Sequence, residues 1–297
     1  MTAAPRERRA ATDEGGRRRD RTRPPVPESL PLPVTDTHCH LDIADGEDDD
    51  QFGPAQAIEA AAGVGVTRIV QVGCDLPGAA WAVELAQQRA EVVATVALHP
   101  NEAPVLAAAG RLHDALAEID RLAGSSERVR GVGETGLDAY RTGPEGSAAQ
   151  EESLRAHVEI ARRRDLALVI HDRDAHDDVL RVLEDTTTPE RVVFHCFSGD
   201  AAMARHCAER GWFLSFAGPV TFKNAEPLRA ALAVTPIKQV LVETDAPFLT
   251  PQPYRGRPNA SYLVPHTVRV MASVLDVRVE ALCEALQANT DRAFGAW

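Results

Sequence analysis

Lysine is almost absent from this sequence: of its 32 basic residues, Lys223 and Lys238 are the only lysines and the rest are arginines. Long apolar runs are absent too, and none approaches the ~20 residues that a membrane-spanning helix requires. The five cysteines are odd in number and show no paired spacing, which argues against a disulfide framework and favours a reducing compartment. The net charge of -12 argues against a general nucleic-acid coat, but not against an enzyme that meets nucleic acid at one local site.

The first 33 residues differ in composition from the rest of the chain. They contain eight arginines, five acidic residues and several prolines, with almost no large apolar side chain before Leu30. Such a segment buries too little surface to offset the entropy that it loses on ordering. We therefore predict a disordered basic, Pro-rich tail over 1–33 and a single domain over 34–297, with a basic arm for nucleic acid as the alternative role of the tail. No apolar signal-peptide core is visible, so we expect a cytoplasmic protein.

From Val34 onward, short apolar segments alternate with helical patterns. Near-continuous apolar strands separated by helices are typical of a parallel sheet covered on both faces. Eight such strands predict a (β/α)8 TIM-type barrel, with an open doubly wound sheet as the alternative. The predicted strands are Val34–His38, Arg68–Val72, Val92–Ala97, Val129–Gly133, Leu166–Ile170, Val192–His195, Trp212–Phe216 and Gln239–Glu243. The predicted helices include Pro54–Ala62, Gly78–Arg89, Leu106–Leu122, Ala149–Arg163, Ala175–Leu183, Ala201–Glu209, Pro265–Val274 and Arg278–Asn289.

Residue types that bind metals follow most of the predicted strands. His38 and His40 close the first strand, and alternate residues of a strand share one face, so both imidazoles can reach one cation. The later candidates are His99, Glu134, His171, His195, Glu243 and Asp245. In a TIM barrel all these positions lie on the C-terminal face, where active sites are found.

Each of these residues also has an ordinary explanation when it is taken singly. A histidine at a strand end is often held by hydrogen bonds, and an acid near glycine or proline often forms a turn. Taken together, several histidines and carboxylates in one pocket would be costly without a cation and favourable with one. The pattern therefore predicts a metal site.

Five motifs in this order resemble the TatD family of metal-dependent deoxyribonucleases. They are DTHCHLD, GETGLD, IHDRD, FHCFSG and ETDAPFL. Five ordered motifs are more specific than one short pattern, and the resemblance extends from about Val34 to Phe294. It implies an amidohydrolase-like barrel that hydrolyses phosphodiester bonds of DNA, often as a 3′-to-5′ exonuclease. It implies neither a membrane nor an obligate protein partner.

The resemblance also implies a set of ligands for two divalent metal ions, with Mg²⁺ as the first expectation and Mn²⁺, Co²⁺ or Zn²⁺ as alternatives. One metal would be held by His38, His40, Glu134 and Asp245. The other would be held by Glu134, His171 and His195, so that Glu134 bridges the two.

Catalysis and substrate binding are expected to involve a few more side chains. Asp245 is the best candidate to orient or deprotonate a metal-bound water, with Glu134 as the second catalytic residue. His99, Arg255 and Arg257 are candidates for substrate binding, since arginine binds phosphate with two hydrogen bonds. For the arginines, solvated loop charges are the alternative. Asn101 stands where many relatives carry a second histidine.

Two other functions are consistent with the same barrel. The first is an amidohydrolase-type enzyme that acts on small amides, lactones or phosphoesters. Many amidohydrolases bridge their metals with a carboxylated lysine at the end of the fourth strand, but this chain has Glu134 there. The second is a binding protein with a structural metal, which six ligand-type residues at one rim disfavour because structural zinc sites are usually closed by four ligands.

Overall fold

The computed structural model of the protein describes residues 6–7, 19–47 and 52–297. Within these residues the strands are β1 (Arg6–Glu7), β2 (Val34–Cys39), β3 (Ile43–Ala44), β4 (Val66–Gly73), β5 (Val92–Val96), β6 (Val129–Asp138), β7 (Ala167–Arg173), β8 (Val192–Phe194), β9 (Phe213–Phe216) and β10 (Val240–Val242). The α-helices are α1 (Pro54–Gly63), α2 (Leu76–Gln88), α3 (Glu102–Ala108), α4 (Leu112–Ala123), α5 (Ser147–Arg164), α6 (His176–Glu184), α7 (Ala201–Glu209), α8 (Glu226–Val234), α9 (Val264–Leu275) and α10 (Val279–Phe294).

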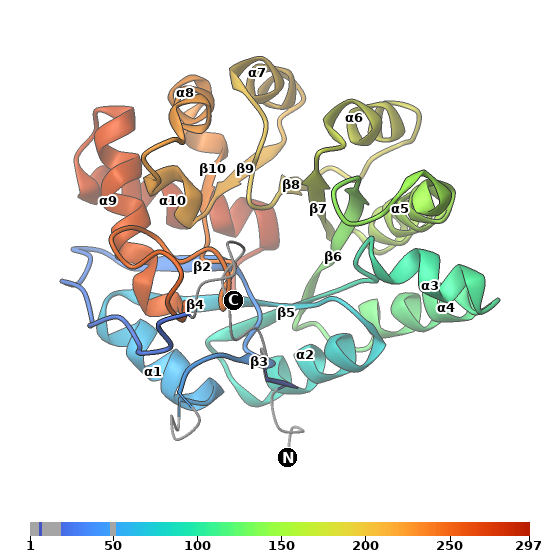
Figure 1. Cartoon of the computed structure of the whole chain (residues 1–297), viewed down its shortest axis with the longest axis horizontal. Helices are drawn as coiled ribbons and strands as arrows, with labels where there is room; N and C mark the ends of the chain where they lie inside the picture. The colour runs from blue at the N-terminus through green and yellow to red at the C-terminus, as the bar shows by residue number, and fades with distance from the viewer. Residues whose placement is uncertain (1–5, 8–18, 48–51) are drawn as a thin grey trace.

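Eight parallel strands form the predicted TIM-type barrel, and the helices surround it (Figure 1). The strand order runs β2, β4, β5, β6, β7, β8, β9, β10. The first and last strands meet through a parallel bridge between Cys39 and Ala246, and the Asp245 amide donates to the His38 carbonyl at 2.9 Å. The barrel prediction is therefore confirmed, and this seam brings the two ends of the sheet together at the C-terminal rim.

The predicted elements differ from the observed ones mainly at their ends. β6 continues to Asp138 because Thr135–Asp138 still pairs with β7, after a register shift that follows Val132. The helix predicted over Leu106–Leu122 is two helices, α3 and α4, which are separated at Gly110. Gly110 has a φ of +66°, a conformation that glycine adopts without strain and that interrupts a helix.

The barrel interior is apolar at its amino end and polar at its carboxyl end. Val70, Val93, Val169 and other inward-facing side chains form one buried cluster, which the end of α10 closes at Phe294. A larger apolar cluster lies between the strands and the helices. Because packed apolar side chains fill the barrel below the rim and the space between strands and helices, the strands that carry the polar rim side chains are held rigidly. No helix in the described part of the chain is long and apolar enough to cross a membrane.

The described part of the N-terminal segment, 19–33, packs on the barrel, in contrast to the disordered tail that we expected. Leu30 is buried, and its amide donates to the Val64 carbonyl at 2.9 Å. The Tyr262 hydroxyl donates to the Pro24 carbonyl at 2.6 Å. These contacts use backbone carbonyls and one apolar side chain, so they leave no periodic apolar pattern in the sequence. Residues 1–5 and 8–18 of the predicted tail lie outside the described residues.

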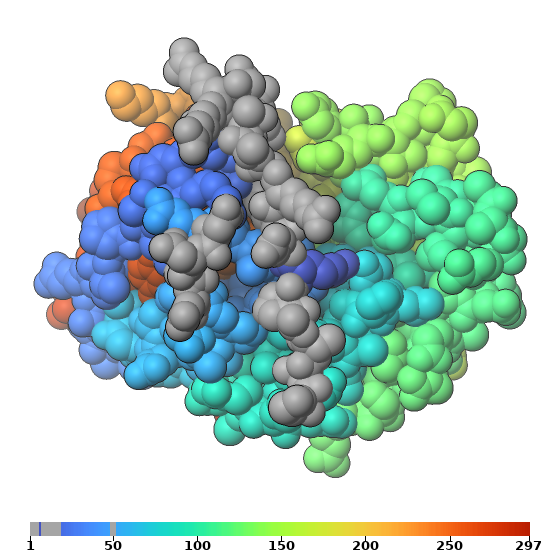
Figure 2. Space-filling model, turned by 60° about the horizontal axis from the view of Figure 1, so that its bottom comes forward, coloured from blue at the N-terminus to red at the C-terminus, as the bar shows by residue number. Residues whose placement is uncertain are grey.

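Arg6 makes a further contact between the N-terminal segment and the rim. β1 pairs in parallel with β3, and the Arg6 guanidinium lies 2.5 Å from both the Asp42 and the Asp75 carboxylates. Figure 2 shows residues 6–7, in the darkest blue, on the surface of the molecule.

Candidate metal centre

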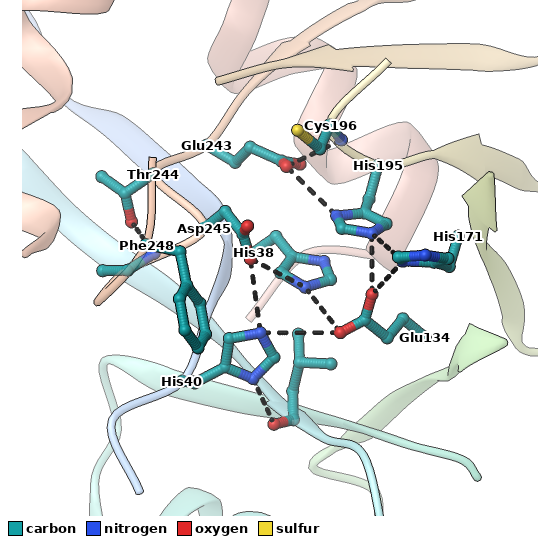
Figure 3. Close-up of polar contacts among 12 residues, drawn as sticks. His38, His40, Glu134, His171, His195, Cys196, Glu243, Thr244, Asp245 and Phe248 are labelled. Atoms are coloured by element: carbon teal, nitrogen blue, oxygen red, sulfur yellow. Dashed lines mark hydrogen bonds and ion pairs between the residues drawn. The ribbon is translucent and has the colours of Figure 1, made fainter. Parts of the chain in front are cut away.

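The first group of predicted ligands meets where β2, β6 and the segment after β10 come together. His40 Nε2 lies 3.6 Å from Glu134 Oε1 and 3.4 Å from Asp245 Oδ1. The corresponding distances from His38 Nε2 are 3.6 and 3.8 Å. Four ligand-type side chains therefore face one point, as Figure 3 shows.

The second group lies on the other side of the Glu134 carboxylate (Figure 3). Glu134 Oε2 is 2.9 Å from His171 Nδ1 and 2.7 Å from His195 Nε2. The two imidazoles are themselves 3.3 Å apart at these nitrogens. One oxygen of Glu134 thus faces the first group and the other faces the second, which is the arrangement that a bridging carboxylate requires.

The environment of His38 supports a cation in the first group. The residue is fully buried, and neither ring nitrogen has a hydrogen-bond partner. Buried polar atoms are normally satisfied, so an orphaned imidazole calls for an explanation. Ligand atoms bound at ~2.1 Å around a tetrahedral centre lie ~3.4 Å apart, close to the 3.4–3.8 Å that separate the two histidines from the carboxylates. The residues present therefore fit a divalent cation.

Neighbouring groups fix the orientation of two of these histidines. His40 Nδ1 lies 3.2 Å from the Val72 carbonyl, so it is expected to donate there and leave Nε2 free as a ligand. His195 Nδ1 lies 3.3 Å from Oε1 of the buried Glu243, which leaves Nε2 facing Glu134. Glu243 follows its strand as predicted, and its carboxylate contacts His195 on the side of the ring away from Glu134.

Glycines on either side of Glu134 allow β6 to approach β7 closely. A Cβ atom on Gly136 would lie 1.8 Å from the His171 carbonyl oxygen, and one on Gly133 would lie 2.4 Å from Val169 Cβ. No other residue type fits at either position without displacing β7. The GETG sequence is thus required to place the Glu134 carboxylate next to His171.

The Glu134 carboxylate and the neighbouring histidines shift one another's pKa values. Burial raises the pKa of the Glu134 carboxyl, but the nearby His195 and His99 outweigh this effect and hold the pKa well below its usual range. Burial lowers the pKa of His195, and the adjacent Glu134 carboxylate more than compensates, so this pKa is well above its usual value. A carboxylate that stays ionised inside a histidine cluster is a good ligand for a cation.

Comparison with known proteins identifies the family of this chain. The model of the family described as TatD related DNase matches residues 35–295. The chain belongs to the TatD family. An uncharacterized metal-dependent hydrolase TatD of Mycobacterium tuberculosis is 42% identical over 88% of this chain and 98% of its own length. The uncharacterized metal-dependent hydrolase YcfH of Escherichia coli is 36% identical over 88% of this chain and 95% of its own.

Solved structures show the same barrel. YjjV, a TatD homologue from Escherichia coli, superimposes with a TM-score of 0.79 at 25% identity, covering 89% of this chain and 98% of its own. A lactonase from Listeria monocytogenes superimposes with a TM-score of 0.63 at 15% identity, covering 89% and 94%, which is a likeness of fold alone. The protein is thus a TatD-family metal-dependent hydrolase.

His99 lies beside the candidate metal centre of this TatD-family chain. Its Nε2 is 3.9 Å from Glu134 Oε2, and its ring packs edge-on against His171 with centroids 4.5 Å apart. Burial lowers the pKa of His99 to about 4, so the ring is neutral at pH 7. A neutral imidazole at this place can donate a hydrogen bond to a substrate oxygen.

Two polar side chains in the site had no role in the sequence-based prediction. Asp138 Oδ2 lies 3.4 Å from His171 Nε2 and accepts a hydrogen bond of 3.4 Å from Asn101 Nδ2. Cys74 Sγ donates to Glu134 Oε1 at 3.1 Å. Asp138 belongs to the GETGLD motif, which was a usable signal, whereas Cys74 follows its strand outside any of the five motifs.

The two arginines that we expected to bind substrate both contact other parts of the protein, and their role in substrate binding stays a prediction. Arg257 donates to the backbone carbonyls of Thr22 at 2.8 Å and Arg23 at 2.7 Å. The Arg255 guanidinium lies 4.4 Å from the centre of the Phe222 ring. Arg257 therefore anchors the N-terminal segment, a role that the composition of residues 1–33 did not indicate.

Proposed function

We propose that the protein is a deoxyribonuclease that uses two divalent metal ions, Mg²⁺ first and Mn²⁺, Co²⁺ or Zn²⁺ as alternatives. The observation that carries the proposal is the Glu134 carboxylate, which has two imidazoles on each side. Two adjacent cations suit phosphodiester hydrolysis because they clamp both the attacking and the leaving oxygens. A 3′-to-5′ exonuclease on DNA is the specific activity that we infer from the TatD family.

The proposed ligands divide at Glu134. His38, His40 and Asp245 would hold one ion, and His171 and His195 the other, with Glu134 shared. Bound divalent cations lower the pKa of coordinated water toward ~7 and polarise phosphoryl oxygens.

The remaining side chains supply orientation and proton transfer. Asp245 Oδ1 lies 3.4 Å from His40 Nε2, so with an ion bound in the first group this carboxylate would be available to orient a water on that ion and to accept its proton. His99 donates to a non-bridging phosphate oxygen from the open side of the site. Glu243 holds His195 in the orientation that directs Nε2 toward Glu134.

Two further inferences belong to this proposal. The five cysteines are free thiols, which suits a cytoplasmic enzyme. A carboxylated lysine forms only when carbon dioxide is added to the lysine amine. A glutamate at the bridging position already carries its carboxylate and needs no such addition.

The test is to remove metal with a chelator and restore it in bicarbonate-free buffer. Single-stranded and double-stranded oligonucleotides are then compared with a lactone and a dihydropyrimidine. We expect DNA cleavage to recover with metal alone, with about two ions bound per chain and little turnover of the small substrates. A requirement for bicarbonate, or faster cleavage of the cyclic substrates than of DNA, would favour the amidohydrolase alternative.

A further inference from the structure

Arg173 and Tyr140 form an arginine–aromatic pair on the rim of the barrel. The guanidinium carbon of Arg173 lies 3.9 Å from the centre of the Tyr140 ring. Arg173 ends β7, and Tyr140 follows the neighbouring strand β6 by two residues (Figure 1). The Ala139 amide donates to the Arg173 carbonyl at 2.9 Å, so strand pairing continues beyond β6 and supports the pair.

The pair lies next to the second group of proposed ligands, because Arg173 follows His171 by two residues on β7. Residues two apart on a strand share a face and are ~7 Å apart, so Arg173 lies on the same face of β7 as His171. Asp138 is the register partner of Arg173, and its carboxylate contacts His171. A nucleic-acid chain with one phosphate at the metal centre would reach this pair with an adjoining nucleotide.

Both side chains are available to a ligand. Tyr140 is 62% exposed, and no other aromatic residue is among the large apolar side chains exposed in the described part of the chain. The Arg173 guanidinium has no carboxylate partner among the described residues. By contrast, Arg162 and Arg181 on the outer helices are paired with glutamates. In a protein with a net charge of -12, an arginine at the mouth of the site without such a partner is free to bind an anion.

We propose that Tyr140 and Arg173 form a nucleotide subsite, in which the open face of Tyr140 stacks on a nucleobase and Arg173 binds the attached phosphate. This inference rests on the proposed deoxyribonuclease function and specifies how the substrate is held. Aromatic rings stack on any base, and arginine binds phosphate in the plane of its guanidinium. The stack with Tyr140 covers one face of that guanidinium and leaves its N–H edges accessible.

The test measures binding of a single-stranded phosphorothioate oligonucleotide, which resists cleavage, by fluorescence anisotropy. A second oligonucleotide has the same backbone but lacks the bases of its last two 3′ nucleotides. We expect Tyr140→Ala to weaken binding of the first about 5- to 100-fold and to leave binding of the second unchanged. Tyr140→Phe keeps the ring and should bind like the wild type, whereas Arg173→Ala should weaken binding of both oligonucleotides.

Trp297→Ala is the matched control. Trp297 stacks with Arg68 at 4.4 Å, and Arg68 lies near the start of β4, at the end of the barrel opposite the rim, so this variant should bind both oligonucleotides normally. Circular dichroism checks that each variant is folded. If Tyr140→Ala binds each oligonucleotide as tightly as the wild type does, and the wild type still cleaves DNA, the subsite is overturned and the proposed function is not. Absence of both DNA binding and cleavage in the wild type would instead overturn the proposed function, and the subsite with it.

Discussion

Two buried histidines in this protein have opposite environments. His157 in α5 is fully satisfied: its Nε2 accepts from the Leu98 amide at 3.1 Å, and its Nδ1 lies 2.7 Å from the Ser153 carbonyl. His38 at the rim is equally buried, but neither of its nitrogens has a hydrogen-bond partner. His38 lies 3.6 and 3.8 Å from the Glu134 and Asp245 carboxylates, whereas the partners of His157 are backbone groups and hydroxyls. Burial alone therefore does not distinguish the two residues, whereas the two ring nitrogens of His38 without hydrogen-bond partners mark it as a candidate metal ligand.

The largest effect should come from Glu134, the residue that joins the two groups of proposed ligands. Glu134→Gln keeps the volume of the side chain but removes the charge that faces four imidazoles. We expect a near-unchanged melting temperature and a loss of turnover of roughly 10²–10³-fold, as for removal of one electrostatic stabiliser, together with a reduced metal content. Atomic absorption and an oligonucleotide cleavage assay measure both quantities. Wild-type turnover at wild-type metal content would show that Glu134 bridges nothing.

His157 should show the reverse, a loss of stability without a loss of chemistry. His157→Ala leaves the Leu98 amide unsatisfied and opens a cavity, so the free energy of unfolding should fall by about 2–4 kcal/mol. Turnover per folded molecule should stay within about twofold of the wild type, because the hydrogen-bond partners of His157 in the described part of the chain, Leu98, Thr135 and Ser153, include no proposed metal ligand. Urea denaturation and the cleavage assay check the two expectations. A large loss of turnover in folded enzyme would place His157 in the site.

The pH dependence of stability sharpens the same comparison. Burial lowers the pKa of His157 to about 4, whereas an unfolded histidine has a pKa of ~6.5. Between these values the unfolded chain binds one more proton than the folded chain, so this residue lowers stability by about 1.4 kcal/mol per pH unit as the pH falls from ~6.5 to ~4. The free energy of unfolding, measured by urea denaturation at pH 7, 6 and 5, should decrease less steeply with falling pH in His157→Ala than in the wild type. Parallel curves would contradict a neutral, buried His157.

The sequence was most informative where residue types that bind metals follow a predicted strand. Period-two spacing predicted that His38 and His40 share a face, and the barrel brings both to Glu134 and Asp245; their role as metal ligands stays a prediction. Glu134 was expected at the end of its strand but lies within β6, because Gly136 lets the strand continue beside β7. Contacts made through backbone carbonyls, such as Arg257 with Thr22, carry no sequence pattern. They escaped prediction for that reason.

The smallest expected effect concerns the N-terminal segment, where buried and exposed apolar residues can be compared directly. Leu30 is 7% exposed and Val26 is 67% exposed. Leu30→Ala should therefore lower the free energy of unfolding by about 1–3 kcal/mol, at the low end for a core substitution because the site lies at the barrel surface. Val26→Ala should change it by less than about 0.5 kcal/mol. Thermal unfolding measures the stability of both variants, and turnover on a short oligonucleotide should be unchanged in each, because neither side chain belongs to the candidate metal centre. If the two variants unfold at the same temperature as the wild type, Leu30 does not dock on the barrel, and residues 19–33 behave as the composition alone suggested.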